Sequence, residues 1–392
     1  MVNNIILYDG DSASSLYPLT FTKPIAELRI GILTIKEKWE KYLALPASFN
    51  TSEYLSGKFP TTATDDNYFI HGSLLPDEDL IDDIKSLEID HGLTHQDKLV
   101  AYRSSTLSTI ESLKNLQAVS KPLNQISHPE QIFKLNEEEL IKDFKLITKG
   151  RFSQKISHTN QTFGEDIFVE EGAYIECSVL NAEPGPIYIG KNAKILEGNL
   201  IRGALAMCEG SVLKMGSKVY GATTLGPTAK FCGEIKNVVV QGNSNKGHSG
   251  YLGNSVIGEW CNFGADTISS NMKNNYAEVK LWDYNMDAFR KTGTQFCGLI
   301  MGDHSKTGIN TMFNTGTVVG VGCNVFGAGY PRTFIPSFSW GGRENNVTNK
   351  LSKCLEVASI MMPRRDQELT QADINILTHI FETTAPNRKW ER

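Results

Sequence analysis

Residues 299–325 read LIMGDHSKTGINTMFNTGTVVGVGCNV, and this stretch contains five mostly apolar residues that are spaced six positions apart. A residue of modest size stands two positions before each of them. An earlier run repeats the pattern. The later run comprises Met301, Thr307, Phe313, Val319 and Val325, preceded by Leu299, Ser305, Thr311, Thr317 and Cys323; the earlier run comprises Ile189, Ile195, Ile201 and Met207, preceded by Ile187, Ala193, Asn199 and Leu205. A period of six predicts a parallel β-helix, in which three such units make one coil. Turns in a β-sandwich, the alternative, recur every 8–12 residues.

Glycine marks the limits of this region, because residues 151–345 contain 28 of the 34 glycines and residues 346–392 contain none. We therefore expect three parts: an α/β domain over 1–150, an all-β helix over 151–345, of about ten coils from residue 163 on, and a tail over 346–392. In the first part the pattern predicts strands at 5–8 and 67–70, an amphipathic helix over 31–45 and a linking helix over 135–147. In the tail, the residue pattern predicts two helices: one that ends near Pro363 and one that starts at a capping box at Thr370.

Composition excludes several classes of protein. The net charge of −5 gives no electrostatic case for nucleic-acid binding. No apolar run long enough for a transmembrane helix is present, and residues 1–10 lack the features of a signal peptide. The seven cysteines contain no C-x-x-C pair, which suits reduced thiols in the cytoplasm.

The repeat is interrupted at residues 246–253, which read KGHSGYLG and contain His248. Such an interruption favours function, because a loop there does not have to serve the stack of coils. The other histidine of the repeat, His304, falls on an ordinary turn and is expected to be structural.

The segment around His248 resembles the acetyltransferase domain of the GlmU family. Residues 233–271, GEIKNVVVQGNSNKGHSGYLGNSVIGEWCNFGADTISSN, match that family's pattern without a gap from Lys236 to Asn271. The resemblance implies a left-handed β-helix, acetyl-CoA as the acyl donor and an amino-sugar phosphate as the acceptor. The acetyltransferase sites of the family lie between the β-helices of neighbouring subunits, so the resemblance also implies a homotrimer.

Roles follow from the same resemblance. His248 falls on the catalytic base, and Ala265 on the position whose backbone N–H faces the developing oxyanion. Lys236 falls on a phosphate contact, and Lys230 matches a phosphate-binding arginine after a gap. The sugar-binding or histidine-orienting positions are Tyr251, Asn262 and Asn271. About 18 extra residues, close to one added coil, precede Met301, and the lysine expected after Asn271 is either Lys280 or Lys291.

The first domain resembles the nucleotidyltransferase domain of the family more weakly. Residues 10–20, GDSASSLYPLT, keep the end of a phosphate-binding loop, although Ser15 replaces the family arginine. Gly10, Asp11, Ser12 and Lys23 are expected to bind nucleotide, with Arg29 as the substitute for that arginine. Nucleotidyl transfer would require Mg²⁺; the usual metal-binding aspartate is Ser73 here, and Asp77 and Asp79 are expected to be solvated surface groups.

These features predict a cytoplasmic enzyme that makes UDP-N-acetylglucosamine from acetyl-CoA, glucosamine 1-phosphate and UTP, with neither nucleic acid nor membrane as partner. Three alternatives remain: an acyltransferase alone with an inactive nucleotide-binding domain, a sugar-1-phosphate thymidylyltransferase that uses dTTP, and a trimeric scaffold without activity.

Overall fold

The computed structural model describes residues 2–108, 110–343 and 346–391, and it begins with a six-stranded mixed sheet in the order β2-β1-β3-β5-β4-β6. β1 pairs in parallel with β2 and β3, and β5 runs antiparallel to β3 and β4. The predicted strands at 5–8 and 67–70 are confirmed. The strands are β1 (Asn4–Tyr8), β2 (Ala47–Asn50), β3 (Asn67–His71), β4 (His91–His95), β5 (Lys98–Ser104) and β6 (Asn115–Ala118).

The helices of this part start where side chains cap them. α1 begins later than predicted, at Ile35, because Thr34 and Glu37 form a capping box. The preceding turn is held by Asp143 of α4, whose carboxylate accepts from the backbone N–H groups of Ile32 and Leu33 at 2.8 and 3.0 Å. The helices are α1 (Ile35–Leu43), α2 (Glu53–Ser56), α3 (Glu78–Lys85) and α4 (Pro129–Thr148), with 3₁₀ turns η1 (Gly10–Leu16), η2 (Ile25–Glu27) and η3 (Ile110–Ser112).

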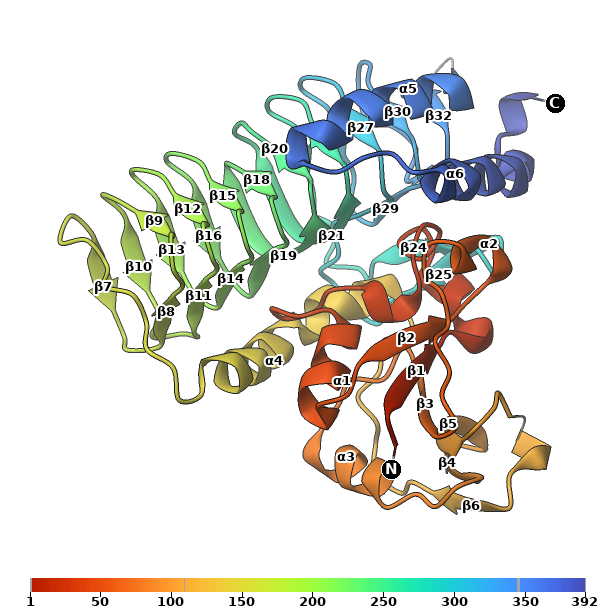
Figure 1. Cartoon of the computed structure of the whole chain (residues 1–392). Helices are drawn as coiled ribbons and strands as arrows, with labels where there is room; N and C mark the ends of the chain where they lie inside the picture. The colour runs from red at the N-terminus through yellow and green to blue at the C-terminus, as the bar shows by residue number, and fades with distance from the viewer. Residues whose placement is uncertain (1, 109, 344–345, 392) are drawn as a thin grey trace.

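The middle of the chain is a parallel β-helix, as predicted, and its strands lie on three faces that we number in chain order (Figure 1). All eighteen side chains of the two six-residue runs are buried. Face one contains β7 (Gln161–Phe163), β10 (Val179–Asn181), β13 (Leu200–Arg202), β16 (Lys218–Tyr220), the first parts of β19 (Glu234–Gly242) and β21 (Tyr251–Glu259), β23 (Ile268–Ser269) and β28 (Met312–Phe313). Face two contains β8 (Ile167–Val169), β11 (Ile187–Ile189), β14 (Leu205–Met207), β17 (Thr223–Leu225), the later parts of β19 and β21, β26 (Leu299–Met301), β29 (Thr317–Val319) and β31 (Phe334–Ile335). Face three contains β9 (Tyr174–Ile175), β12 (Lys194–Ile195), β15 (Val212–Leu213), β18 (Lys230–Phe231), β20 (Asn245–Lys246), β22 (Asn262–Phe263), β27 (Lys306–Thr307), β30 (Asn324–Val325) and β32 (Ser339–Gly341), which also pairs with β33 (Val347–Thr348).

The extra residues before Met301 do not form an added coil, which corrects the expectation from length. They leave the helix after β23 and form an antiparallel hairpin of β24 (Lys280–Asp283) and β25 (Ala288–Lys291). The hairpin folds onto the first domain, where the Arg290 guanidinium donates to both carboxylate oxygens of Glu130 at 2.9 and 3.0 Å.

The tail contains the two predicted helices, α5 (Leu351–Met361) and α6 (Gln371–Thr383), with 3₁₀ turns η4 (Met362–Arg365), η5 (Ala385–Asn387) and η6 (Lys389–Glu391). The capping box at Thr370 is confirmed, with Asp373 as its partner. α5 lies along the β-helix (Figure 1), and Cys354 packs there with Val321 and Phe338. No helix in the described part of the chain is long and apolar enough to cross a bilayer.

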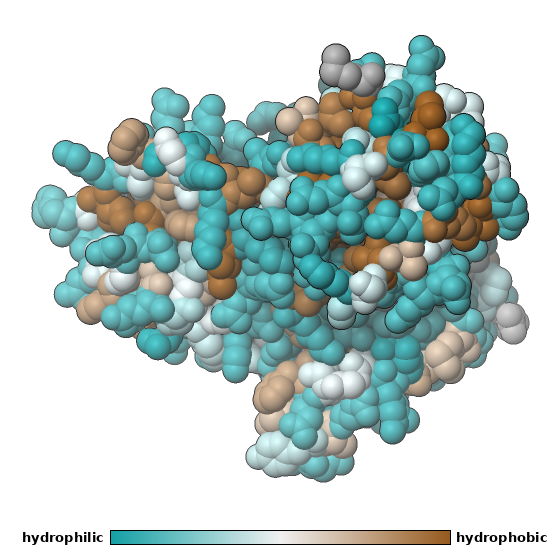
Figure 2. Space-filling view, turned by 90° about the horizontal axis from the view of Figure 1, so that it is seen from below, coloured by the Kyte–Doolittle hydropathy of each residue, from teal (hydrophilic) through white to brown (hydrophobic). Residues whose placement is uncertain are grey.

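Face two packs against the first domain. Its outward residues Val239, Val256, Ile300 and Val318 belong to the same buried cluster as Ile5 and other core residues of the first domain. The two parts therefore share one hydrophobic core. Figure 2 shows the molecule from below, where hydrophilic side chains cover most of the surface and hydrophobic patches lie between them.

Candidate functional site

His248 lies on an exposed corner between faces three and one, and the backbone of that corner is fixed from inside. The side chain of Lys246 points into the β-helix, where its ammonium donates to the carbonyl oxygens of His248 and Ser249 at 3.0 and 2.7 Å. Burial lowers the pKa of Lys246 to about 8. The arrangement holds the main chain while the imidazole of His248 faces solvent.

Ala265 lies one coil beyond His248 at the equivalent corner. β20 pairs with β22 in the register Asn245 to Asn262 and Lys246 to Phe263, and the same offset brings His248 opposite Ala265. Neighbouring strands are about 4.8 Å apart. Ala265 and His248 are therefore neighbours on adjacent coils of this corner.

Three predicted residues come together on face one. Asn271 Nδ2 donates to the hydroxyl oxygen of Tyr251 at 2.9 Å and to Asn254 Oδ1 at 2.7 Å. Lys236 lies on the next strand, with its Nζ 5.7 and 5.9 Å from the ring centres of Tyr220 and Phe296.

Gly253 makes this arrangement possible, because a Cβ there would lie 2.2 Å from the Tyr251 hydroxyl and 2.8 Å from Asn271 Nδ2. The glycine in KGHSGYLG thus leaves room for a polar network.

The other two predicted substrate residues, Lys230 and Asn262, lie on face three. They belong to one ladder with Asn245, whose Nδ2 donates to Asn262 Oδ1 at 2.9 Å. The structure therefore divides the predicted contacts between two faces, and these faces meet at the corner that carries His248.

One cation on face one was missed by the sequence reasoning. Lys218 is exposed and pairs in register with Glu234, which pairs in turn with Tyr251. Tyr220, not Lys218, is the register partner of Lys236, so a count of three six-residue units back from Lys236 gives a residue that lies two positions out of register.

In the first domain, Gly10, Asp11 and Ser12 start η1 at the carboxyl end of β1. His71 ends the parallel neighbour β3, and a Cβ on Gly10 would lie 3.6 Å from its Nε2. Loops at the carboxyl ends of adjacent parallel strands are where open α/β sheets bind ligands. Burial lowers the pKa of His71 to about 4, so its ring, which is 2.8 Å from Ser73 Oγ, is neutral at pH 7.

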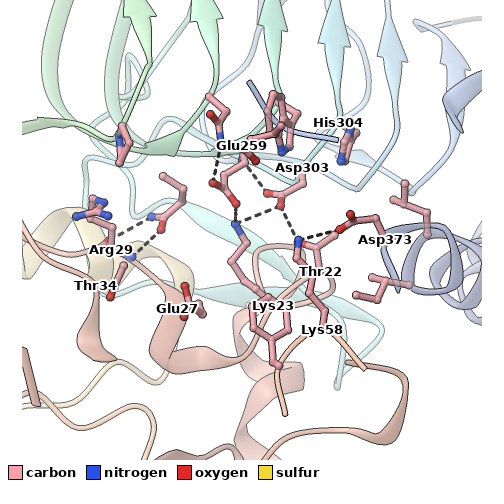
Figure 3. A pocket seen from close by; sticks show the side chains of 18 residues that line it. Thr22, Lys23, Glu27, Arg29, Thr34, Lys58, Glu259, Asp303, His304 and Asp373 are labelled. Carbon is pink, nitrogen blue, oxygen red and sulfur yellow. Dashed lines mark hydrogen bonds and ion pairs between the residues drawn. The ribbon is translucent and has the colours of Figure 1, made fainter. Parts of the chain in front are cut away.

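Lys23 and Arg29 make their contacts elsewhere, at the junction with the β-helix (Figure 3). The ammonium of Lys23 bonds to Glu259 and lies 3.3 Å from Asp303 Oδ2, and both carboxylates belong to the β-helix. Arg29 Nη1 donates to the carbonyl oxygen of Ile32 and lies 3.3 Å from Glu37. These groups surround a cavity of about 230 Å³. The polar contacts of both side chains are therefore at this junction.

Among the described residues, no group of three or more His, Cys, Asp or Glu side chains is arranged to hold a metal ion. Asp77 caps α3 through the N–H of Leu80 at 2.9 Å, and Asp79 pairs with Lys121. Asp11 is an exposed residue of the loop Gly10–Ser12. Because Mg²⁺ is often held by one or two carboxylates and the phosphates of the substrate, Asp11 fits such a role without a larger cluster.

Comparison with known proteins relates the chain to sugar-nucleotide enzymes. Residues 5–152 match the family model described as sugar nucleotidyl transferase. The chain is 39% identical over 90 residues to the bifunctional protein GlmU of Methanocaldococcus jannaschii, which is 23% of this chain and 21% of that protein. The chain resembles GlmU. The matched part of the chain spans about a fifth of the length of this relative and of the GlmU proteins of Methanococcus aeolicus and Methanococcus vannielii.

Two further relatives extend this similarity. The bifunctional sugar-1-phosphate nucleotidylyltransferase/acetyltransferase of Sulfurisphaera tokodaii is 34% identical over 94 residues, 24% of this chain and 23% of that protein. The GlmU of Bartonella quintana is 26% identical over 198 residues, 48% of this chain and 38% of that protein. The expected resemblance of the chain to the GlmU family is confirmed.

Proposed function

We propose that the protein makes UDP-N-acetylglucosamine in two steps, acetyl transfer to glucosamine 1-phosphate and then uridylyl transfer from UTP. The observation that carries the first step is the corner at His248, where an exposed imidazole on a fixed backbone stands between two rows of polar and basic side chains. The names of the GlmU relatives support a bifunctional enzyme of this kind.

Acetyl transfer starts when the neutral amine of the sugar phosphate attacks the carbonyl carbon of acetyl-CoA, while His248 accepts a proton from the nitrogen as the carbon–nitrogen bond forms. The backbone N–H of Ala265 donates to the oxyanion of the tetrahedral intermediate, a contact worth about 3 kcal/mol. The intermediate collapses, the carbon–sulfur bond breaks, and the imidazolium returns the proton to the leaving thiolate.

The substrate is held on face one in this mechanism. The Tyr251 hydroxyl, fixed by Asn271, binds the sugar, and Lys236 binds the phosphate, with Lys218 on the same face. Asn262 and Lys230 approach the corner from face three.

Uridylyl transfer is assigned to the loop Gly10–Ser12. Backbone N–H groups there would bind the phosphates of UTP while the sugar phosphate attacks the α-phosphorus and pyrophosphate leaves. Bound Mg²⁺ would neutralise charge on the phosphates, and Asp11 would share in holding it. Lys23 and Arg29 remain predicted nucleotide ligands, but they serve only if they leave their present partners.

The engagement of Lys23 and Arg29 at the domain junction favours a second candidate, an acetyltransferase with a nucleotide-binding but inactive first domain. A thymidylyltransferase would use the same loop with dTTP.

We also propose a cytoplasmic homotrimer. Several large apolar side chains on the β-helix are exposed, which is typical of surfaces that another subunit covers: Leu200, Met215, Ile268 and Ile309.

The test of the first step is His248→Ala, with His158→Ala as the matched control because His158 is an exposed histidine far along the chain from the corner. We expect His248→Ala to lower the rate of thiol release from acetyl-CoA with glucosamine 1-phosphate by about 10²–10⁴-fold. The control should keep the wild-type rate. Full activity of the His248 variant would exclude the assignment.

The second step is tested on the product with Mg²⁺ and either UTP or dTTP, by following pyrophosphate. Release with UTP supports the bifunctional enzyme, and thiol release without pyrophosphate selects the acetyltransferase alone. Pyrophosphate with dTTP and no thiol selects the thymidylyltransferase. If neither thiol nor pyrophosphate is released, the trimeric scaffold without activity is the remaining alternative.

A further inference from the structure

The cavity of about 230 Å³ at the domain junction is lined by all three parts of the chain. Glu27 and Arg29 come from the first domain and His304 from the β-helix, while α6 lines the remaining side (Figure 3). Neither the corner at His248 nor the loop at Gly10–Ser12 contributes a described residue to its wall. This space, which we call the junction cavity, is therefore separate from both places where the reactions are proposed to occur.

Most charged groups of the junction cavity are already paired with one another. The ammonium of Lys23 contacts Glu259 and Asp303, and the ammonium of Lys58 lies 2.8 Å from Asp373 Oδ1. These pairs neutralise each other, so they offer no counter-charge to a bound molecule. A ligand would be recognised by the groups of the wall that are still unpaired.

Two buried side chains of the wall have an unpaired nitrogen. Arg29 and His304 are each only 8% exposed, and Arg29 Nε and His304 Nδ1 have no hydrogen-bond partner in the described part of the chain. Figure 3 shows them on opposite sides of Lys23. Because nearly all buried polar groups are hydrogen-bonded, both nitrogens mark positions where a bound molecule would complete the wall.

An unpaired carboxylate stands beside one of these nitrogens in the sequence. Glu27 lines the same cavity, and none of the described side chains or N–H groups donates a hydrogen bond to its carboxylate. Burial raises the pKa of Glu27, and the charges of Lys36 and Lys23 oppose that rise. Glu27 and Arg29, two residues apart, thus present an anion and a cationic donor that each lack a partner in the cavity.

An α-amino acid matches this pair of groups. Its carboxylate can accept from Arg29 Nε while its ammonium donates to Glu27, and hydrogen bonds between ionised partners are among the strong ones. Burial lowers the pKa of His304 to about 3, so the imidazole is neutral and suits an uncharged polar side chain. A volume of about 230 Å³ is smaller than the pockets of roughly 300–1,000 Å³ that hold drug-sized molecules, which fits a ligand of this size.

We propose that the junction cavity binds a free α-amino acid with an uncharged polar side chain, held by Arg29, Glu27 and His304. Because the first domain, the β-helix and the tail all line the cavity, the bound amino acid would hold the three parts together. The proposal goes beyond the two transfer reactions and does not depend on either of them.

The test starts with thermal melts of the full chain in the presence of L-serine, L-threonine, L-asparagine or L-glutamine. D-Glucose serves as a polar molecule without charge. We expect at least one of the four amino acids to raise the melting temperature, because a ligand that binds only the folded state stabilises it. Calorimetric titration then compares that amino acid with its N-acetyl derivative, which lacks the ammonium, and with its amide, which lacks the carboxylate.

Two variants assign the two charges to their partners. Glu27→Gln should weaken binding of the amino acid by about 10- to 100-fold and abolish the preference over the N-acetyl derivative. Arg29→Gln should abolish the preference over the amide and keep the preference over the N-acetyl derivative. Glu53→Gln is the matched control, because Glu53 is an exposed carboxylate of α2 outside the cavity, and it should bind as the wild type does. Thermal melts without ligand show that each variant folds.

The proposal would be overturned if none of the four amino acids changed the melting temperature. Equal affinity of the folded Glu27→Gln variant and the Glu53→Gln control would also overturn it. A melting temperature that only D-glucose raises would show that the cavity takes an uncharged molecule, contrary to the proposal.

Discussion

Asp9 lies at the end of β1, directly before the loop at Gly10–Ser12, and its carboxylate is buried. One oxygen accepts from the backbone N–H of Ile25 at 2.9 Å and the other from the hydroxyl of Thr51 at 2.5 Å. Burial raises the pKa of Asp9 to about 6. The folded protein therefore holds this proton more tightly than the unfolded chain, so ionisation of Asp9 costs stability as the pH rises from about 4 to about 6.

Asp9→Asn removes that cost and keeps an acceptor for Ile25. We expect the free energy of unfolding of the variant, relative to the wild type, to increase by about 3 kcal/mol between pH 4 and pH 7, because two pKa units correspond to that energy. Urea unfolding of both proteins at four pH values measures the difference. If the difference in the free energy of unfolding between the two proteins did not change with pH, the raised pKa of Asp9 would be contradicted.

At the scale of elements, the hairpin β24–β25 joins the β-helix to the first domain through aromatic side chains. The ring of Tyr284 packs edge-on against the rings of Tyr17 and Phe21, with ring centres 5.7 and 5.3 Å apart. Its hydroxyl is buried and has no hydrogen-bond partner among the described residues. The ring therefore stabilises the contact and the hydroxyl does not.

Tyr284→Ala should lower the free energy of unfolding by about 3 kcal/mol, because it removes a packed ring. Tyr284→Phe keeps the ring and removes the unpaired hydroxyl, so it should leave stability unchanged or raise it by about 1 kcal/mol. Chemical denaturation of the two variants tests the pair together. A Phe variant as unstable as the Ala variant would show that the hydroxyl has a partner.

The hairpin also shows why sequence predicts some elements and not others. The buried positions of the β-helix were predictable because each six-residue unit fixes which side chains point inward, as Phe313 and Val319 do. The hairpin carries no such repeat, and its antiparallel pairing and packing depend on a domain far away in the sequence. The ion pairs of Lys23 could not be predicted for the same reason. Its partners Glu259 and Asp303 lie more than 200 residues later in the sequence, and a local match to a phosphate-binding loop contains no information about them.

At the scale of the whole molecule, the three faces of the β-helix have different surroundings. Face two carries the first domain, the tail approaches face three, and face one presents Lys218, Lys236 and Tyr251. The first domain and the β-helix share a hydrophobic core, and the junction is closed by Lys23. We therefore expect the two parts to unfold together, in a single calorimetric transition.

Lys23→Met tests this junction and separates a structural role of Lys23 from nucleotide binding. The variant leaves Glu259 and Asp303 without their buried cation, which should cost about 3–5 kcal/mol. Adding Asp303→Asn removes one of the two carboxylates, so the double variant should regain part of that loss. Scanning calorimetry measures both, and UTP titration of the folded variants supplies the second readout. A Lys23 variant that keeps its stability but binds UTP more weakly would instead assign Lys23 to the nucleotide.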